Sequence, residues 1–406
     1  MGSRSLVPTL IAVALVLAGL PASSSAAEVR LVRNATTEFA PFITNPSPAA
    51  AGWMRNHYFQ MRGYSPYFDN NALPWSPPPT SFYRDLYAIY NNQAGNQLIA
   101  SHPDWVLRDG AGRPLYIPYG CSGGSCPQYA ANVGNAGWRS HWIAGARATF
   151  DYSASRSPDG SGYAGIYIDD VNLPMHVGNG SGDDVAPIDS RTGAPMTEQN
   201  WQRYVADFVE QIRAALPHVQ ITHNPIWWIP HSDPEVRRQV DAADVIEIER
   251  GFTDPGLVRG RGKYGHVTLM RHIDWLHKRG KSVMLEPYID SVAEARFELA
   301  NYLLVRGRRD SITTHFRTDP PAAGGKWWQH WALDPGRARR GRFEKGGLWL
   351  RKFRRGTAIV NPPGAPPRRV RFKRKRRSLT GKVSRRFRLD TREGDFFRKT
   401  RRGKRR

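Results

Sequence analysis

Residues 161–172, SGYAGIYIDDVN, decide the fold class because they join a short apolar strand to a pair of carboxylates. The apolar run IYI (166–168) is β-branched and aromatic, which favours a packed sheet. Asp169 and Asp170 follow directly, and charged side chains are costly to bury without partners. The stretch therefore predicts a buried strand that ends in a polar cleft. Alternation along the strand sends the two acids to different sides, so we do not expect them to be equivalent.

Other strand-like segments recur along the chain, each rich in β-branched or aromatic residues. They are HYFQMR (57–62), DLYAIYNN (85–92), RPLYIPYG (113–120), VQITHN (219–224), DVIEIE (244–249), SVMLEPY (282–288) and SITTHF (311–316).

Helix-like segments separate several of these strands. Apolar residues recur at helical spacing over 199–216, and 266–280 ends in basic residues and a glycine. Residues 291–307 open with Ser291 and Glu294, which fits a capping box. Strands alternating with helices predict an α/β fold, and about eight strands match a (β/α)8 TIM barrel. An open doubly wound sheet is the alternative, but no Gly-rich phosphate loop follows an early strand.

The positive charge is concentrated at the end of the chain. From Gly341 to Arg406 there are 26 Lys/Arg and 4 Asp/Glu, a balance of +22, whereas the preceding residues carry +2. Apolar and basic residues alternate in 347–372 and 382–390, which predicts short antiparallel strands with one buried face. No helical or zinc-finger reader accompanies the charge, so specific nucleic-acid binding is not expected.

The first residues predict export. Arg4 supplies positive charge, residues 6–20 form an apolar run, and SSSAAE (23–28) offers a cleavage site near Ala27. That run is short for a membrane span and no later run approaches the roughly 20 residues a span needs. We therefore expect a secreted protein without a stable span after cleavage, and an uncleaved anchor is the alternative.

The expected domains follow from these boundaries. They are a signal peptide (1–27), a catalytic barrel (28–335), a basic β-sandwich-like domain (336–397) and a disordered basic tail (398–406). Cys121 and Cys126, in YGCSGGSCPQ, are the two cysteines. In an oxidising compartment they are expected to form a disulfide around a small Gly/Ser loop, with free thiols as the alternative.

Polar side chains close several of the strand-like segments: Asp169, Asp170, His223, Asn224, Glu247, Glu249 and Glu286. In a barrel, side chains at the carboxyl ends of the strands point into the mouth where substrates bind. Any single acid fits equally well a solvated strand end or a helix cap. Several such strand ends together indicate a shared acidic site.

Aromatic residues give a second indication. The chain has 13 tryptophans, and Trp105, Trp227 and Trp228 lie close to predicted strand ends. Most tryptophans pack in cores, but aromatic faces near the acids would suit sugar rings. The histidines are scattered without zinc spacing, and no GxSxG elbow indicates a serine hydrolase. We therefore expect no metal and no cofactor.

Several motifs together resemble exported glycoside-hydrolase-like barrel families, which are loosely similar to polygalactosaminidase-type and α-galactosidase-type enzymes. The resemblance spans roughly residues 55–320. It rests on SHPDWVLRDGAGRPLY (101–116), NAGWRSHWI (135–143), GYAGIYIDDVN (162–172), ITHNP (221–225), IEIERGF (246–252) and LEPY (285–288).

The resemblance implies that Asp169 is the strand-four catalytic acid and Glu249 the strand-six acid. Glu247 lies two residues earlier on the same face, so the choice between the two glutamates stays open. Glycosidases use one protonated and one ionised carboxyl group. We expect Asp169 as nucleophile or base and Glu249 as general acid, with retention or inversion of the anomeric centre undecided.

The expected activity is cleavage of O-glycosidic bonds in a polysaccharide. The side chains expected to bind the substrate are Tyr58, Arg62, Trp105, Asp170, Asn224, Glu247 and Glu286. One alternative is a carbohydrate-binding barrel without catalysis. Another is adhesion to an anionic polymer, such as a cell-wall polymer, through the basic C-terminal region.

Overall fold

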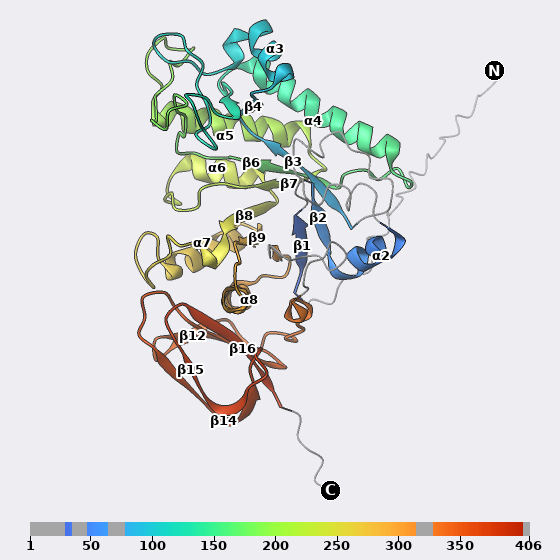
Figure 1. Ribbon diagram of the computed structural model, residues 1–406, viewed down its shortest axis with the longest axis vertical. Coiled ribbons are helices and arrows are strands. Elements are labelled where there is room, and N and C mark those ends of the chain that lie inside the picture. Colours follow the sequence, from blue (N-terminus) through green and yellow to red (C-terminus); the bar gives the residue numbers. More distant parts are fainter. Residues whose placement is uncertain (1–28, 35–46, 64–77, 314–327, 401–406) are drawn as a thin grey trace, which may run out of the picture.

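The computed structural model describes residues 29–34, 47–63, 78–313 and 328–400. Its larger part is a closed barrel of eight strands (Figure 1). Every neighbouring pair is parallel, and β10 closes the barrel against β1. The strands are β1 (Leu31–Asn34), β2 (Gln60–Arg62), β3 (Thr80–Asp85), β6 (Gly165–Asp169), β7 (Gln220–His223), β8 (Val245–Arg250), β9 (Ser282–Pro287) and β10 (Ser311–Thr313). The predicted (β/α)8 barrel is confirmed.

Helices surround the barrel. They are α2 (Pro48–His57), α3 (Gln93–Ser101), α4 (Ala136–Arg156), α5 (Glu198–Ala215), α6 (Pro234–Ala242), α7 (His266–Lys278) and α8 (Val292–Val305). The predicted helices correspond to α5, α7 and α8. At the start of α8, the Glu294 amide donates to Ser291 Oγ, and Glu294 Oε2 accepts from the Asp290 amide. This reciprocal bonding confirms the capping box. The Glu294 carboxylate accepts from the amide of Asp290, one residue before the cap Ser291, and not from the amide of Ser291 itself.

Two strand predictions were wrong in position. Residues 85–92 do not form a barrel strand, because β3 ends at Asp85, whose carboxylate accepts the Tyr87 and Ala88 amides at 2.8 Å each. These bonds turn the chain out of the barrel, where β4 (Ala88–Tyr90) pairs antiparallel with β5 (Gln128–Ala130). Residues 113–120 form isolated bridges only, since two of their residues are prolines without an amide donor. The first barrel strand, β1, was not predicted.

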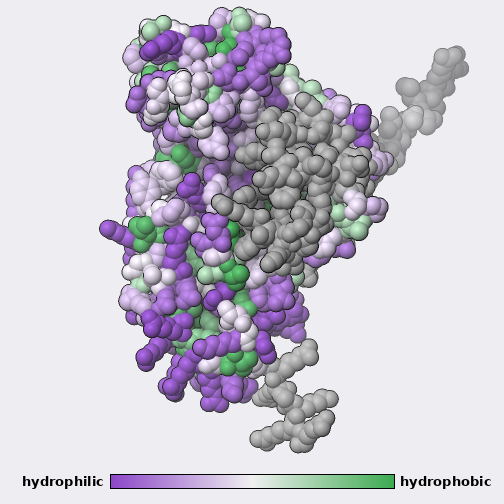
Figure 2. Space-filling model, in the orientation of Figure 1, coloured by the Kyte–Doolittle hydropathy of each residue, from purple (hydrophilic) through white to green (hydrophobic). Residues whose placement is uncertain are grey.

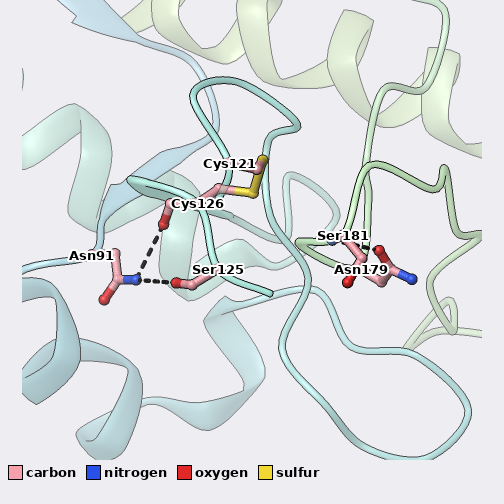
Figure 3. The surroundings of a disulfide bond; sticks show 6 residues. All are labelled: Asn91, Cys121, Ser125, Cys126, Asn179 and Ser181. Atoms are coloured by element: carbon pink, nitrogen blue, oxygen red, sulfur yellow. Dashed lines mark hydrogen bonds between the residues drawn. A yellow bond between two sulfur atoms is a disulfide. The ribbon is translucent and has the colours of Figure 1, made fainter. Parts of the chain in front are cut away.

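The predicted disulfide between Cys121 and Cys126 is formed (Figure 3). Beside it, the Asn91 side chain donates to Ser125 Oγ at 3.0 Å and to the Cys126 carbonyl at 3.1 Å. The covalent loop is thus anchored to the segment that follows β4.

A six-stranded antiparallel sheet follows the barrel, in the order β11-β12-β13-β16-β14-β15. Its strands are β11 (Phe343–Lys345), β12 (Leu348–Lys352), β13 (Gly356–Asn361), β14 (Arg368–Arg377), β15 (Val383–Leu389) and β16 (Glu393–Lys399). One face, including Ala358, Val360 and Phe396, joins the main core beside α8. The other face encloses a separate small core. The expected β-sandwich is therefore one sheet that curls around its own core.

The end of this sheet differs from the expected tail. Strand β16 continues to Lys399, so the predicted tail from 398 begins inside a strand, where Lys399 donates its amide to the Arg355 carbonyl. Residues 401–406 and the predicted signal peptide (1–27) lie outside the described residues. Within the described ranges, no helix is both long and apolar enough to cross a membrane.

Candidate functional site

Six carboxyl groups meet at the carboxyl ends of four barrel strands. β6 and β8 are the fourth and sixth barrel strands in chain order, as the resemblance implied. Register places Asp85 beside Asp169 and Glu249 beside Glu286. The acids are Asp85 on β3, Asp169 and Asp170 at the end of β6, Glu247 and Glu249 on β8, and Glu286 on β9.

Asp169 is held by three donors. Tyr83 Oη donates to Oδ2 at 2.6 Å, and Asn224 Nδ2 and the Asp170 amide donate to Oδ1 at 2.8 and 2.9 Å. The side chain is half-buried. Three donors from the described residues fill three of the roughly four lone-pair positions of the carboxylate, so they fix its orientation and leave one position free.

Glu249 lies next to Asp169 and is exposed. Its Oε2 accepts from the same Asn224 amide nitrogen at 3.2 Å, and its Oε1 accepts from Tyr288 Oη at 2.7 Å. One nitrogen contacts an oxygen of each acid, so these two oxygens lie within about 6 Å of each other. Asn224 therefore joins the two predicted catalytic acids in one fixed arrangement.

Asp170 faces a different partner from Asp169. Its backbone is left-handed, with φ 51°, and its carboxyl group forms a hydrogen bond with that of Asp85. Burial, followed by repulsion from Asp169, raises the pKa of Asp85 to about 7. Burial and repulsion from Asp85 and Asp169 raise the pKa of Asp170 well above its usual range. The pair therefore retains a proton that the two carboxyl groups share.

A buried ion-pair cluster lies beneath the exposed acids. Arg62 donates to Glu247 Oε2 at 2.6 Å and to Glu286 Oε1 at 2.5 Å, and its guanidinium stacks 3.9 Å from the Tyr167 ring. Burial raises the pKa of Glu247 well above its usual range, against the attraction of Arg62, and repulsion from Glu286 raises it further. Arg62, Glu247 and Glu286 are 3%, 0% and 6% exposed.

These exposures separate the two glutamates on β8. Glu247 is enclosed and bonded to Arg62 and Tyr167, whereas Glu249 is exposed beside Asp169. Of the two side chains, Glu249 is therefore the one that a ligand could reach from solvent. Arg62, Glu247 and Glu286, which were expected to bind substrate, are buried, and both glutamates are ion-paired with Arg62.

Two residues expected to bind substrate lie elsewhere. Tyr58 ends α2, before β2 begins, and is 3% exposed in the main core against Trp53. It therefore lies toward the amino-terminal end of its strand, opposite the acids. Trp105 stacks on His102 at 3.8 Å and packs against Trp138 on α4. The structure does not bring either aromatic side chain into contact with the acid cluster.

Sequence reasoning missed three members of the cluster. Tyr83 and Asp85 lie on β3, whose extent was misplaced, and alternation of TSFYRD would have directed both inward had the strand been recognised. Tyr288 follows β9 and is the last residue of the LEPY motif, but no site role was predicted for it. Its position two residues after Glu286 was the available signal.

The loop after Glu249 is fixed from two sides. Glu298 on α8 accepts the Phe252 amide at 2.9 Å, and the Arg392 guanidinium donates to the Thr253 and Asp254 carbonyls. Gly251 has φ 51°, and a Cβ there would lie 2.6 Å from Glu298 Oε1, so only glycine fits.

This loop in turn reaches the acid through a tyrosine. Thr253 Oγ1 accepts the Tyr288 amide at 3.0 Å, and Tyr288 Oη donates to Glu249. Arg392 lies in the turn between β15 and β16. The C-terminal sheet thus contributes to the support of the β8 acid.

Two cavities in the described part of the chain lie away from the acids. One of about 490 Å³ lies between α7 and the sheet, lined by Arg261, Met270, Arg271 and Trp349 among others. A second, of about 160 Å³, includes Gln60, Gln220 and Ser282 at the amino-terminal ends of strands. β1, β2 and β10 are followed by residues 35–46, 64–77 and 314–327, outside the described part. Among the described residues, no group of three His, Cys, Asp or Glu could hold a metal ion.

We predict that Asp170→Asn flattens the pH dependence of stability. Asp85 and Asp170 have folded pKa values above the roughly 3.9 of an unfolded aspartate. Their contribution is complete below that value and is lost as pH rises through the folded pKa values, about 7 for Asp85. An asparagine amide donates to Asp85 without a proton to lose, and it tolerates positive φ.

Urea unfolding at several pH values between about 4 and 8 measures this effect. Asp170→Ala is the matched control, since it lacks the donor and is strained at φ 51°, and should be less stable by about 1–2 kcal/mol. Parallel pH profiles for the wild type and Asp170→Asn would contradict the shared proton.

We also predict that Arg392→Ala loosens the loop after Glu249. Loss of the guanidinium removes two bonds to loop carbonyls, so the Phe252 and Tyr288 amides should exchange with deuterium faster. Hydrogen-exchange mass spectrometry of peptides covering 250–254 and 288 measures this. Arg388→Ala is the control, because Arg388 lies on the same sheet and, among the described residues, its side chain bonds to Asp390 and not to the loop after Glu249. Equal exchange in both variants would show that the sheet does not support the loop.

Comparison with known proteins gives fold neighbours only. No protein-family model and no curated protein sequence matches this chain. One similar solved structure is the glycoside hydrolase domain of PelA from Pseudomonas aeruginosa, with 14% identity, a TM-score of 0.39, and coverage of 73% of this chain and 96% of that chain. Another is an α-amylase from Geobacillus thermoleovorans, with 9% identity, a TM-score of 0.45, and coverage of 92% and 98%.

A third is a GH36 α-galactosidase from Geobacillus stearothermophilus, with 11% identity, a TM-score of 0.43, and coverage of 91% of this chain and 55% of that chain. At such identities and TM-scores these structures assign no activity, which depends on the side chains described above.

Proposed function

We propose that this protein is a glycoside hydrolase in which Asp169 and Glu249 are the catalytic pair. The observation that carries the proposal is the Asn224 amide, which contacts Asp169 Oδ1 at 2.8 Å and Glu249 Oε2 at 3.2 Å. The amide thus joins two carboxyl groups at the carboxyl end of a barrel, of which one is half-buried and one exposed. Glycosidic cleavage requires such a pair of neighbouring carboxyl groups.

The separation supports retention of the anomeric configuration. Retaining enzymes place their carboxyl groups about 5–5.5 Å apart, whereas inverting enzymes leave about 6.5–9.5 Å for a water molecule. The nearest oxygens of Asp169 and Glu249 lie within about 6 Å. This bound lies below the range of inverting enzymes.

The proposed reaction proceeds in two displacements. Asp169 attacks the anomeric carbon and forms an ester with the sugar, while Glu249 gives a proton to the departing glycosidic oxygen. Glu249 then takes a proton from a water molecule that attacks the same carbon. The C–O bond to Asp169 breaks, its carboxylate is restored, and the sugar leaves with a new hydroxyl group.

The surroundings fit these two roles. Tyr83 and Asn224 hold Asp169 in one orientation, so its free lone-pair position is oriented before substrate arrives. Tyr288 is 43% exposed and bonded to Glu249, which places an aromatic ring where a sugar could contact it. We further propose that the substrate is an extracellular polysaccharide, which export and the formed disulfide would suit.

A carbohydrate-binding barrel without catalysis is the second candidate. The observation that favours it is the bonding of Glu249 to both Asn224 and Tyr288, since the same contacts would let the acid serve only as a sugar-hydroxyl acceptor. The two candidates share a ligand class and differ only in bond cleavage.

We predict that Asp169→Asn abolishes release of reducing ends from a panel of polysaccharides. Glu249→Gln should lower it by about a hundredfold or more, as expected when a general acid is lost. Both substitutions are nearly isosteric, so circular dichroism and the melting temperature should be unchanged.

Glu247→Gln is the matched comparison on the same strand. Glu247 is enclosed and its two oxygens accept from Arg62 and Tyr167, so it does not reach the leaving oxygen and its replacement by glutamine should cost much less activity. Full activity in Glu249→Gln together with loss in Glu247→Gln would reverse the assignment. Binding to glycans without reducing-end release by the wild type would favour the non-catalytic barrel.

A further inference from the structure

The β14–β15 hairpin carries an unusual concentration of positive charge. Residues 368–389 contain 12 Lys/Arg and no Asp or Glu. In Figure 1 this hairpin forms the wall of the sheet farthest from the barrel, and Figure 2 shows hydrophilic residues over this end of the molecule. The positive charge that is concentrated near the end of the sequence is therefore largely part of a folded surface.

Alternation separates this hairpin into two faces. Val370 is paired directly with Phe387, and both point into the small core with Leu389. The intervening residues point outward and are exposed: Arg369, Arg371, Lys373, Arg386 and Arg388. The small core thus fixes the outward direction of the arginines.

Like charges lie directly opposite each other on this outward face. Arg369 is paired with Arg388, and Arg371 with Arg386. Cβ atoms of such pairs are about 4.5–5.5 Å apart, and like charges there are destabilising. Arg388 has Asp390 at 2.9 Å, whereas the side chains of Arg369, Arg371 and Arg386 have no hydrogen-bond or ion-pair partner in the described part of the chain. A folded sheet that tolerates this repulsion presents a ready site for an extended anion.

We propose that the outward face of β14–β15 binds a polyanionic polysaccharide with regularly spaced carboxylates. Residues two apart on a strand repeat at about 6.5–7 Å, so the face offers a row of guanidinium groups to an extended chain that carries carboxylates along its length. Guanidinium groups bind carboxylates through two parallel hydrogen bonds, which adds geometric selectivity to the charge attraction.

The residues between the arginines favour a glycan over other polyanions. Single-stranded nucleic acid is bound by exposed aromatic rings among the basic residues, but Phe372 and Phe387 pack into the small core. A membrane surface is bound with exposed apolar side chains, and within these two strands Val383, at 41%, is the large hydrophobic residue that is exposed. The choice of a glycan also rests on the proposed function of the barrel.

The experiment compares two sets of four substitutions in the full-length protein. The test variant carries Arg369→Gln, Arg371→Gln, Arg386→Gln and Arg388→Gln. The control carries Arg156→Gln, Arg203→Gln, Arg237→Gln and Arg308→Gln, which removes the same charge from exposed positions of the barrel region. Both sets are made also with Asp169→Asn, so that binding is measured without turnover and does not depend on the proposed catalysis.

Binding of polygalacturonate is measured between about 50 and 200 mM salt, because the affinity of a basic surface for a polyanion falls strongly over this range. Dextran serves as the neutral polymer. The test variant should bind about tenfold or more weakly, and its slope of log affinity against log salt should fall by about three. Its melting temperature should equal or exceed that of the wild type, because like-charge pairs are removed. The variant that carries the four hairpin substitutions but keeps Asp169 should hydrolyse a small soluble glycoside as fast as the wild type.

Three outcomes would overturn the proposal. The wild type could bind polygalacturonate no better than dextran, or the barrel control could weaken binding as much as the test variant, which would indicate net charge alone. Single-stranded DNA or phosphatidylglycerol vesicles could bind more tightly through the same four arginines, which would assign the face to another class of partner. Absence of glycosidase activity with intact polygalacturonate binding would reject the barrel's proposed function and leave this face as a binding site.

Discussion

The carboxyl end of this barrel holds more acidic side chains than nearby positive charges can neutralise, and this imbalance is the constraint on which the arrangement of the site depends. Six carboxyl groups converge there, and Arg62 is the guanidinium that forms ion pairs with two of them. Carboxylates so close together cannot all ionise in a partly buried site, so some keep their protons at pH values where free carboxylic acids lose them. The raised pKa values of Asp85, Asp170 and Glu247 are the direct consequence.

That constraint divides the acids into two layers. The lower layer, with Arg62, Glu247 and Glu286, is enclosed and neutralises its charge internally. The upper layer exposes Glu249 beside half-buried Asp169. Both upper acids are followed by a residue with positive φ, 51° at Asp170 and 62° at Arg250. Non-glycine residues adopt this conformation at a cost, and it often marks functional sites. Here it turns the chain sharply after each acid and separates neighbouring side chains.

Much of this arrangement could be predicted from strand ends. Asp169, Asn224 and Glu249 each lie at the carboxyl end of a predicted strand, and parallel strands bring their carboxyl ends together. What sequence could not supply was the starting point of the strands. Asp85 was placed at the beginning of a predicted strand although it ends one, because the apolar run that follows it resembles a strand equally well. Tyr58 was assigned to the mouth, whereas it precedes its strand. Arg392 supports the loop after β8 although it lies 139 residues from Thr253 in the sequence. No local sequence pattern reveals such a contact.

The central claim is that Asp169 attacks the anomeric carbon while Glu249 donates a proton to the leaving oxygen. Incubation of the wild type with a panel of activated 2-fluoro-glycosides, followed by peptide mass mapping, tests it most directly, because the fluorine slows hydrolysis of a glycosyl ester enough for it to be isolated. The structure predicts one added sugar on the peptide that contains Asp169, and none in Asp169→Asn. A sugar attached to Glu249 or Glu247, or products of inverted configuration with no attached sugar, would contradict it.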